Sequence, residues 1–207
     1  MKITCNKKAT MSEKRLAFVC KAASPSIIGR SMDSVLFLDD ADTTIVTAYA
    51  TDGKRLHFAQ LLREWVESLK VYICDRDNPD SWIGTEFVHR AKSSWILGGK
   101  TEGKYPNVLK VIPEIFSNID NVNIKTKRYQ TDKHSFVANY FYKISRLESG
   151  NFPVINPEFL YDIYSDNFCS WIGQIIGPHK PVRLWVEAFE PHVMGAVIMP
   201  MDMTEGE

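Results

Sequence analysis

The sequence predicts an α+β protein in which antiparallel sheets are combined with a few helices, in two similar domains over residues 1–117 and 118–207. Runs rich in β-branched and aromatic residues alternate with turn dipeptides, which is typical of antiparallel hairpins. Apolar residues recur at helical spacing in only a few short segments. The polar segment SNIDN (117–121) marks the boundary, and 207 residues are enough for two domains of about 100 residues each.

The N-terminal part predicts a strand followed by a helix. Residues 2–9 are expected to form the first strand. Thr10 and Glu13 have the spacing of a capping box, in which each side chain binds the backbone N–H of the other residue. A helix is therefore predicted over 11–23, where apolar residues follow the i, i+3, i+4, i+7 pattern.

A β-hairpin is predicted around Asp52-Gly53, a dipeptide that favours tight turns between antiparallel strands. SVLFL (34–38) and TTIVTAYA (43–50) precede this turn and have the composition of strands. RLHF (55–58) follows the turn and is expected to be the return strand of the hairpin.

Helical spacing of apolar residues predicts two further helices, over 59–69 and 135–148. A short helix is predicted over 157–165, because Asn156-Pro157-Glu158 has the order of an N-cap, a first helical proline and an acidic first turn. The remaining predicted elements are a loop at 97–107 and strands at 71–74, 85–92, 122–129, 182–189 and 193–201.

The composition excludes some classes of protein. The 25 Lys and Arg residues balance the 25 Asp and Glu residues, so bulk charge does not hold the chain on nucleic acid, although a local basic face stays open. The four cysteines are far apart and form neither a CxxC pair nor a disulfide framework. The chain shows no signal peptide and no apolar run of about 20 residues, so a soluble cytoplasmic protein is expected.

No motif in the sequence indicates catalysis. The run Gly98-Gly99-Lys100-Thr101 lacks the first glycine of a phosphate-binding loop and is interpreted as a surface turn. The five histidines have no metal-binding spacing and are expected at the surface. No serine or cysteine stands in a nucleophile signature. The sequence therefore predicts a protein that is not an enzyme and that needs no metal or cofactor.

Three motifs resemble the bacterial DNA polymerase III beta subunit, the sliding clamp of replication. TDGKRL (51–56) and GKYPNVLKVIP (103–113) resemble two segments of its middle domain. The closing segments INPEFLYDIY, VRLWVEAF and GAVIMPM resemble its last domain. The resemblance implies the clamp fold, in which antiparallel sheets lie outside and helices inside.

The resemblance also implies a function. Sliding clamps are processivity factors that encircle duplex DNA without sequence preference and dock DNA polymerase and the clamp loader through short peptides. Clamp rings contain six domains, so a two-domain chain implies a homotrimer, and its reduced size suggests a phage or mobile-element origin. The alternative is a clamp-derived adaptor or decoy that binds clamp-interacting peptides without encircling DNA. One departure is Asp202, because bacterial clamps have a basic residue at that point of the tail.

The resemblance implies a DNA-facing set of cations on two helices. A contact with phosphates through such cations is independent of sequence and permits sliding. The alternative is that these cations belong to ordinary solvated helix faces, and Glu158 and Asp162 on the short helix have the wrong sign for DNA. The implied DNA-facing residues are Lys14, Arg15, Lys21, Lys143 and Arg146.

The resemblance also implies a hydrophobic pocket for partner peptides, between the TDG turn and the last strand. Methionines suit such a site, because flexible thioethers adapt to varied apolar peptides. The alternative is that Val197 and Met199 are core residues of a terminal strand. The implied pocket residues are Met32, Thr51, Gly53, Lys54, Leu56, Pro113, Val197, Met199, Pro200, Met201 and Met203.

Overall fold

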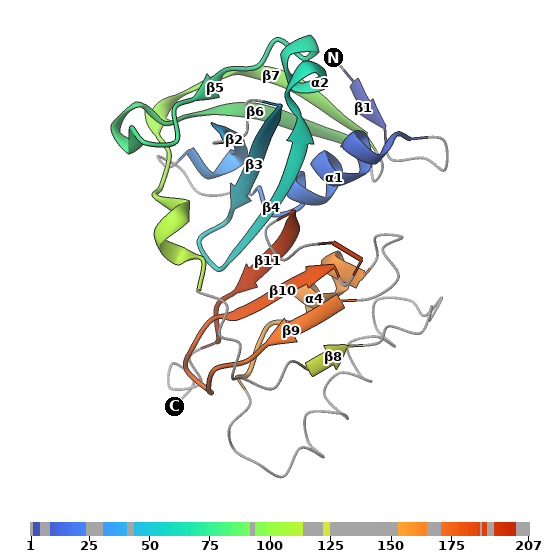
Figure 1. Cartoon of the computed structure of the whole chain (residues 1–207), viewed down its shortest axis with the longest axis vertical. Helices are drawn as coiled ribbons and strands as arrows, with labels where there is room; N and C mark the ends of the chain where they lie inside the picture. Colours follow the sequence, from blue (N-terminus) through green and yellow to red (C-terminus); the bar gives the residue numbers. More distant parts are fainter. Residues whose placement is uncertain are drawn as a thin grey trace. The chain divides into compact units, whose positions relative to one another are not determined.

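The chain folds into antiparallel β-sheet with few helices, which confirms the predicted α+β class (Figure 1). The computed structural model describes residues 2–4, 9–23, 31–40, 44–91, 94–113, 122–124, 153–164, 171–186, 188–189 and 193–201. Two compact units are present: unit 1 is Met1–Val111 with His192–Met194, and unit 2 is Ile112–Pro191 with Gly195–Glu207. The predicted domain boundary at 117–121 lies outside the described residues and stays a prediction.

Unit 1 is built on one twisted sheet. Its strand order is β1-β7-β6-β2-β3-β4, all antiparallel, and β5 pairs with β2 in parallel. The elements of unit 1 are β1 (Lys2–Thr4), α1 (Met11–Cys20), β2 (Ser34–Asp39), β3 (Ile45–Thr51), β4 (Arg55–Leu62), α2 (Arg63–Ser68), β5 (Ile73–Cys74), β6 (Ile83–Ala91) and β7 (Ser94–Lys104), with 3-10 turns at Ser31–Asp33, Pro79–Ser81 and Val108–Val111.

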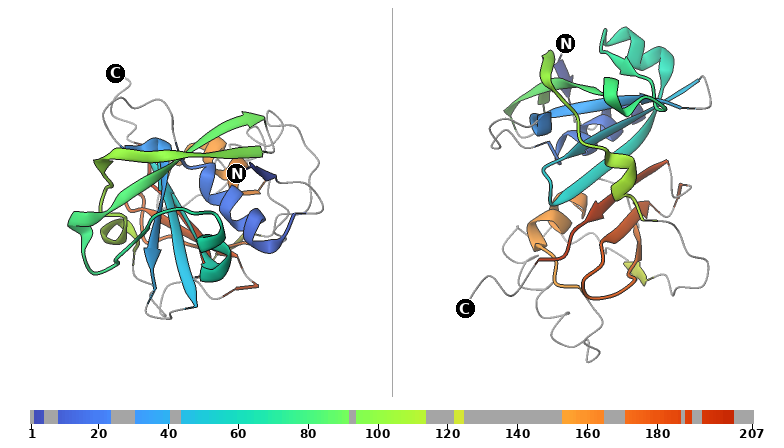
Figure 2. Two further views of the ribbon diagram at one scale, coloured as in Figure 1. Left: turned by 90° about the horizontal axis from the view of Figure 1, so that it is seen from above. Right: turned by 90° about the vertical axis from the view of Figure 1, so that its left-hand side faces the viewer.

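The capping box predicted for the first helix is present at the start of α1. The Thr10 N–H donates to the Glu13 carboxylate at 2.7 Å, and the Glu13 N–H donates to Thr10 Oγ1 at 3.3 Å. The helix ends at Cys20, three residues before the predicted end. Its buried side, with Leu16, Phe18 and Val19, packs against β2, β3 and β4 (Figure 2).

The predicted hairpin at Asp52-Gly53 joins β3 to β4, and Gly53 has a φ of 85°. Glycine adopts this left-handed conformation without steric cost. The predicted helix over 59–69 was wrong in its first four residues, because these continue β4, where Ala59 and Leu61 pair with β3. Burial in the sheet outweighs the helical spacing up to residue 62, and α2 begins at Arg63.

The loop predicted at 97–107 was wrong, because most of it belongs to β7. β7 pairs with β6 in a long hairpin whose register shifts at three places. These irregularities accommodate the glycines of the segment within a strand. Thr101 Oγ1 lies 3.1 Å from both Gly84 N and Gly84 O, so its hydroxyl is used in pairing the two strands.

The strands of unit 2 pair in antiparallel fashion, in the order β8-β9-β10-β11. Its core contains Trp171 and Leu184 from the sheet and Ile163 from α4. No helix among the described residues of either unit is long and apolar enough to cross a membrane. The elements of unit 2 are β8 (Val122–Ile124), α4 (Pro157–Tyr164), β9 (Trp171–Gln174), β10 (Val182–Val186) and β11 (Met194–Ile198), whose first residue is counted in unit 1.

The predicted helix over 157–165 is confirmed as α4, and the Glu158 N–H donates to the Asn156 side chain at 2.9 Å. The strand predicted over 182–189 ends at Val186. All five residues of this strand are buried, so its alternating apolar and polar residues do not correspond to a buried and an exposed face. β9 was not predicted. The predicted helix over 135–148 and most of the predicted strand over 122–129 lie outside the described residues.

Candidate docking and DNA-facing surfaces

The TDGKRL segment is a turn held by its own side chains. Asp52 Oδ1 accepts hydrogen bonds from the backbone N–H groups of Lys54 and Arg55, both at 3.0 Å. The Thr51 hydroxyl donates to the Arg55 carbonyl at 2.6 Å and accepts from the Gly53 N–H at 3.1 Å. The motif therefore specifies one backbone conformation for the end of the β3–β4 hairpin.

Arg55 ties this turn to the end of α1. Its Nε pairs with Asp52 Oδ2 at 3.0 Å, and its Nη2 donates to the carbonyl of Lys21 at 2.8 Å. Lys21 is the C-cap of α1, where backbone carbonyls have no partner inside the helix. A cation at this end of the helix also interacts favourably with the negative end of the helix dipole. Arg55 is thus a positioning residue that sequence analysis did not select.

Most of the predicted docking residues of unit 1 are buried. Met32, Thr51 and Leu56 are inside the unit, whereas Gly53 and Lys54 are exposed at the tip of the turn. The Met32 thioether lies under the turn, because a Cβ added to Gly53 would stand 3.6 Å from Met32 Cε. Of these five residues, only Gly53 and Lys54 are therefore exposed to solvent.

The predicted docking residues of unit 2 also divide into buried and exposed groups. Val197 is buried in β11, so it is a core residue, as the alternative interpretation stated. Met199 and Met201 follow the strand and are each 38% exposed, with half-buried Pro200 between them. The Met201 N–H donates to the Val154 carbonyl at 2.7 Å, which holds this tail segment on its unit.

Pro113 is the remaining predicted docking residue in the part of the chain that the structure describes. Pro113 is half-buried, and its carbonyl accepts a hydrogen bond from Arg183 Nη1. Arg183 is a buried cation of β10, so this bond contributes to the structure of unit 2. Met203 lies outside the described residues.

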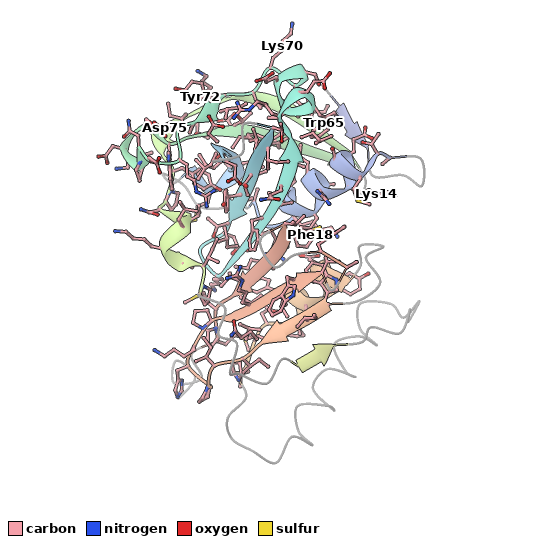
Figure 3. All side chains as sticks on the ribbon, viewed as in Figure 1. Lys14, Phe18, Trp65, Lys70, Tyr72 and Asp75 are labelled. Atoms are coloured by element: carbon pink, nitrogen blue, oxygen red, sulfur yellow. The ribbon has the colours of Figure 1, made fainter. Side chains whose placement is uncertain are left out.

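The predicted DNA-facing residues of α1 are half-buried. Lys14 lies one turn before Phe18 on this helix (Figure 3). Arg15 Nη1 donates to the Gln60 carbonyl at 3.0 Å, and burial lowers the pKa of its guanidinium from the ordinary value. Arg15 therefore also fastens α1 to β4. Lys143 and Arg146 lie outside the described residues.

The prediction that all histidines lie at the surface was wrong for His57. This residue of β4 is completely buried where the strand packs against α1. Its ring stacks on Phe18 with centroids 4.4 Å apart, and its Nδ1 lies 2.9 Å from the Phe18 carbonyl. Burial and then the charge of Arg55 hold the pKa of His57 well below its ordinary value. His57 is therefore a neutral packing residue that links strand and helix.

Within the described ranges, no group of three or more His, Cys, Asp or Glu side chains could hold a metal ion. The Gly98–Thr101 run lies in β7 and not in a surface turn, and Thr101 bonds to Gly84 of the neighbouring strand. Of the predicted docking residues that the structure describes, those exposed lie at the β3–β4 turn (Gly53, Lys54) and in the tail (Met199, Met201).

No protein-family model and no curated protein matches the sequence. Solved sliding clamps do match the structure. The DNA polymerase III beta chain from Streptococcus pneumoniae is 16% identical, with a TM-score of 0.57, over 93% of this chain and 63% of that one. The beta subunit from Thermotoga maritima is 13% identical, with a TM-score of 0.57, over 92% and 63%.

A third solved structure is the Helicobacter pylori beta clamp bound to a DNA ligase peptide, 13% identical with a TM-score of 0.55 over 91% of this chain and 62% of that one. The chain thus spans less than two thirds of the length of the clamps that it matches. At these identities the similarity confirms the fold, and the resemblance of the three motifs to clamps is in agreement with it.

Proposed function

We propose that this protein is a non-enzymatic sliding clamp, a processivity factor that encircles duplex DNA and docks polymerase and clamp-loader peptides. The observation that carries the proposal is the clamp fold. More than nine tenths of this chain matches the structures of solved beta clamps. The structured TDGKRL turn and the exposed methionines of the tail support it, since both belong to the motifs that resemble clamps.

The proposed DNA contact is sequence-independent and is made by cations of the helices. The described candidates are Lys14 and Arg15 on α1 and Lys21 at its C-cap, and Lys143 and Arg146 complete the set. Three copies of the chain would supply the six units of a clamp ring, and closed cyclic assembly satisfies head-to-tail interfaces. We therefore propose a homotrimeric ring.

We expect the 207-residue chain to be a trimer by mass measurement in solution and to be retained on circular DNA but released from linear DNA. The double variant Lys14→Glu with Lys21→Glu should keep the trimer mass. It should bind DNA more weakly. A plot of the logarithm of its DNA-binding constant against the logarithm of salt concentration should have a slope smaller in magnitude by about one for each lost phosphate contact.

The matched control for this charge change is Lys110→Glu with Lys180→Glu, since both lysines are exposed and neither belongs to the proposed DNA-facing set. A strict monomer at high protein concentration would contradict the ring. Equal loss of DNA binding in the two double variants would contradict the assignment of Lys14 and Lys21.

The proposed partner is a short peptide with apolar anchor residues. Met199 and Met201 present flexible thioethers at the surface of unit 2, and Lys54 and Gly53 are exposed in unit 1. We propose that both groups of residues contribute to peptide docking. Thioethers adapt to varied apolar side chains, which suits a protein with several partners.

We expect the double variant Met199→Ala with Met201→Ala to weaken peptide binding by at least about tenfold, because each truncation removes apolar contact area worth roughly 1 kcal/mol or more. The probe is the DNA ligase peptide that the Helicobacter pylori clamp binds, measured by calorimetry. Met11→Ala is the matched control, since Met11 is also exposed but lies on α1. Unchanged affinity in the folded double variant would refute docking at the tail.

The adaptor or decoy remains the second candidate, and the acidic side of α4 favours it. Glu158 is exposed and Asp162 is half-buried on this helix, and both repel phosphates. The net charge of the chain is zero. Peptide binding that is lost in the methionine double variant, without any retention on circular DNA, would establish this second function.

A further inference from the structure

The methionines of this chain differ sharply in exposure. Met32 and Met194 are 5% and 0% exposed, so their sulfur atoms are shielded from solvent. Met11, Met199 and Met201 are 50%, 38% and 38% exposed. Reactivity of a thioether toward soluble oxidants follows its access to solvent. Among its described residues, the tail therefore carries two accessible thioethers, only two positions apart.

The backbone of this tail segment is held independently of the two thioethers. The Met201 N–H donates to the Val154 carbonyl, and Ile198 at the end of β11 is completely buried. Arg183 and Val197 pair β10 with β11 directly before the segment. A change of polarity at the two sulfur atoms thus alters the surface of the tail and leaves the contacts that hold the tail intact.

We propose that Met199 and Met201 form an oxidation site through which a peroxide switches off peptide docking at the tail. The inference rests on the proposed docking function. The two residues are exposed apolar groups that a peptide would contact, and their sulfur atoms are the accessible ones among the described residues of the tail. The same two atoms therefore serve recognition and oxidation.

The reaction with hydrogen peroxide is balanced for each methionine. The sulfur lone pair attacks one peroxide oxygen, an S–O bond forms and the O–O bond breaks. The departing hydroxide takes the proton of the transferred oxygen and leaves as water. The sulfur loses two electrons and the peroxide gains them, so the products are one sulfoxide and one water. Methionine sulfoxide reductases reverse this step.

A sulfoxide weakens docking because it is polar and strongly hydrated. An apolar peptide side chain that covers the sulfoxide removes its water without supplying a hydrogen bond, which is unfavourable. Oxidation at both positions should weaken binding of the DNA ligase peptide by at least about tenfold. Reduction of the sulfoxides should restore the original affinity.

The first experiment maps the oxidation. The full chain is treated with limiting hydrogen peroxide, the peroxide is removed with catalase, and sulfoxides are located by fragmentation of tryptic peptides. Met194, Met199, Met201 and Met203 share the tryptic peptide 184–207, so fragment ions assign each one. We expect Met199 and Met201 to be oxidised before Met32 and Met194. Equal oxidation of the buried pair in the folded protein would overturn the proposal.

The second experiment measures peptide binding before and after oxidation. The variant Met199→Leu with Met201→Leu keeps the apolar volume and cannot be oxidised at these positions, so its affinity should survive peroxide. Met11→Leu is the matched control, because it also removes one exposed methionine. After peroxide treatment this variant should lose affinity for the peptide as the wild type does. Sulfoxide reductases should restore binding of the wild type.

The outcomes separate this inference from the proposed function. If the untreated protein does not bind the peptide, docking itself is refuted and the switch falls with it. If the untreated protein binds and the oxidised wild type keeps its affinity, only the switch is overturned. The switch is likewise overturned if the double leucine variant loses affinity on oxidation as much as the wild type does.

Discussion

Gly84→Ala should lower the free energy of unfolding by about 3 kcal/mol, the upper part of the range for overpacked cores. A Cβ on Gly84 would stand 1.9 Å from Ser34 Oγ and 2.8 Å from Ser34 Cβ. Rotation of the hydroxyl relieves the first contact, but the second involves an atom fixed to the backbone of β2. Ser34 is completely buried, and Tyr105 Cδ2 closes the other side at 3.1 Å. β6 and β2 must therefore move apart.

Urea unfolding at neutral pH measures this effect through the midpoint and slope of the transition. Gly99→Ala is the matched control, because Gly99 lies in neighbouring β7 and its added Cβ would meet nothing within 4 Å. Its stability should stay within about 0.5 kcal/mol of the wild type. Equal stability of the two variants would show that the close approach of β6 to β2 does not limit side-chain size.

Acidification should destabilise unit 1 through His57 between pH 6.5 and 5. The ordinary histidine pKa is 6.5, and burial followed by the charge of Arg55 holds the folded pKa well below it. The unfolded chain therefore binds the proton more strongly, and the stability that His57 contributes is complete above pH 6.5. It is lost as pH falls through this window, with a slope of at most about 1.4 kcal/mol per pH unit.

The geometry explains why the proton is excluded. His57 Nδ1 donates to the Phe18 carbonyl, so a second proton would occupy Nε2, which is buried and has no hydrogen-bond partner among the described residues. The added charge would also face Arg55 and Lys21. Protonation of His57 therefore destabilises its buried position against Phe18, and this contact joins β4 to α1.

Urea unfolding at pH 7.5, 6.5 and 5.5 tests this pH dependence. His57→Gln removes the titrating group, so the variant should be less stable at pH 7.5 but should lose the slope between pH 6.5 and 5.5. His179→Gln, at an exposed position, should keep the slope of the wild type. A wild-type stability that is constant over this range would contradict a depressed pKa at His57.

Local rules were sufficient where a few neighbouring residues decide the structure. Thr10 with Glu13 and Asn156 with Pro157 predicted the starts of α1 and α4, and both caps are present. Asp52-Gly53 predicted the β3–β4 turn. In each case hydrogen bonds span at most four residues, so the sequence contains all of the partners.

Local rules failed where distant residues decide. The helical spacing of 59–69 conflicted with pairing to β3, and the sheet prevailed as far as Leu62 because the pairing buries Ala59 and Leu61. The glycines of 97–107 indicated a loop, but β6 supplies the hydrogen bonds that make this segment a strand. Neither outcome follows from the segment itself, since the stabilising partner lies elsewhere in the chain.

The sequence by itself determined the α+β class, the starts of α1 and α4, the main hairpin and the resemblance to sliding clamps, because motifs and turn chemistry are local. Only the tertiary structure decided which side chains of those motifs reach solvent. It buries Thr51, Leu56 and Val197 and exposes Lys54, Met199 and Met201. It also gives Arg55 and His57 their roles in holding the end of α1 and its inner face, because their partners are 34 and 39 residues away.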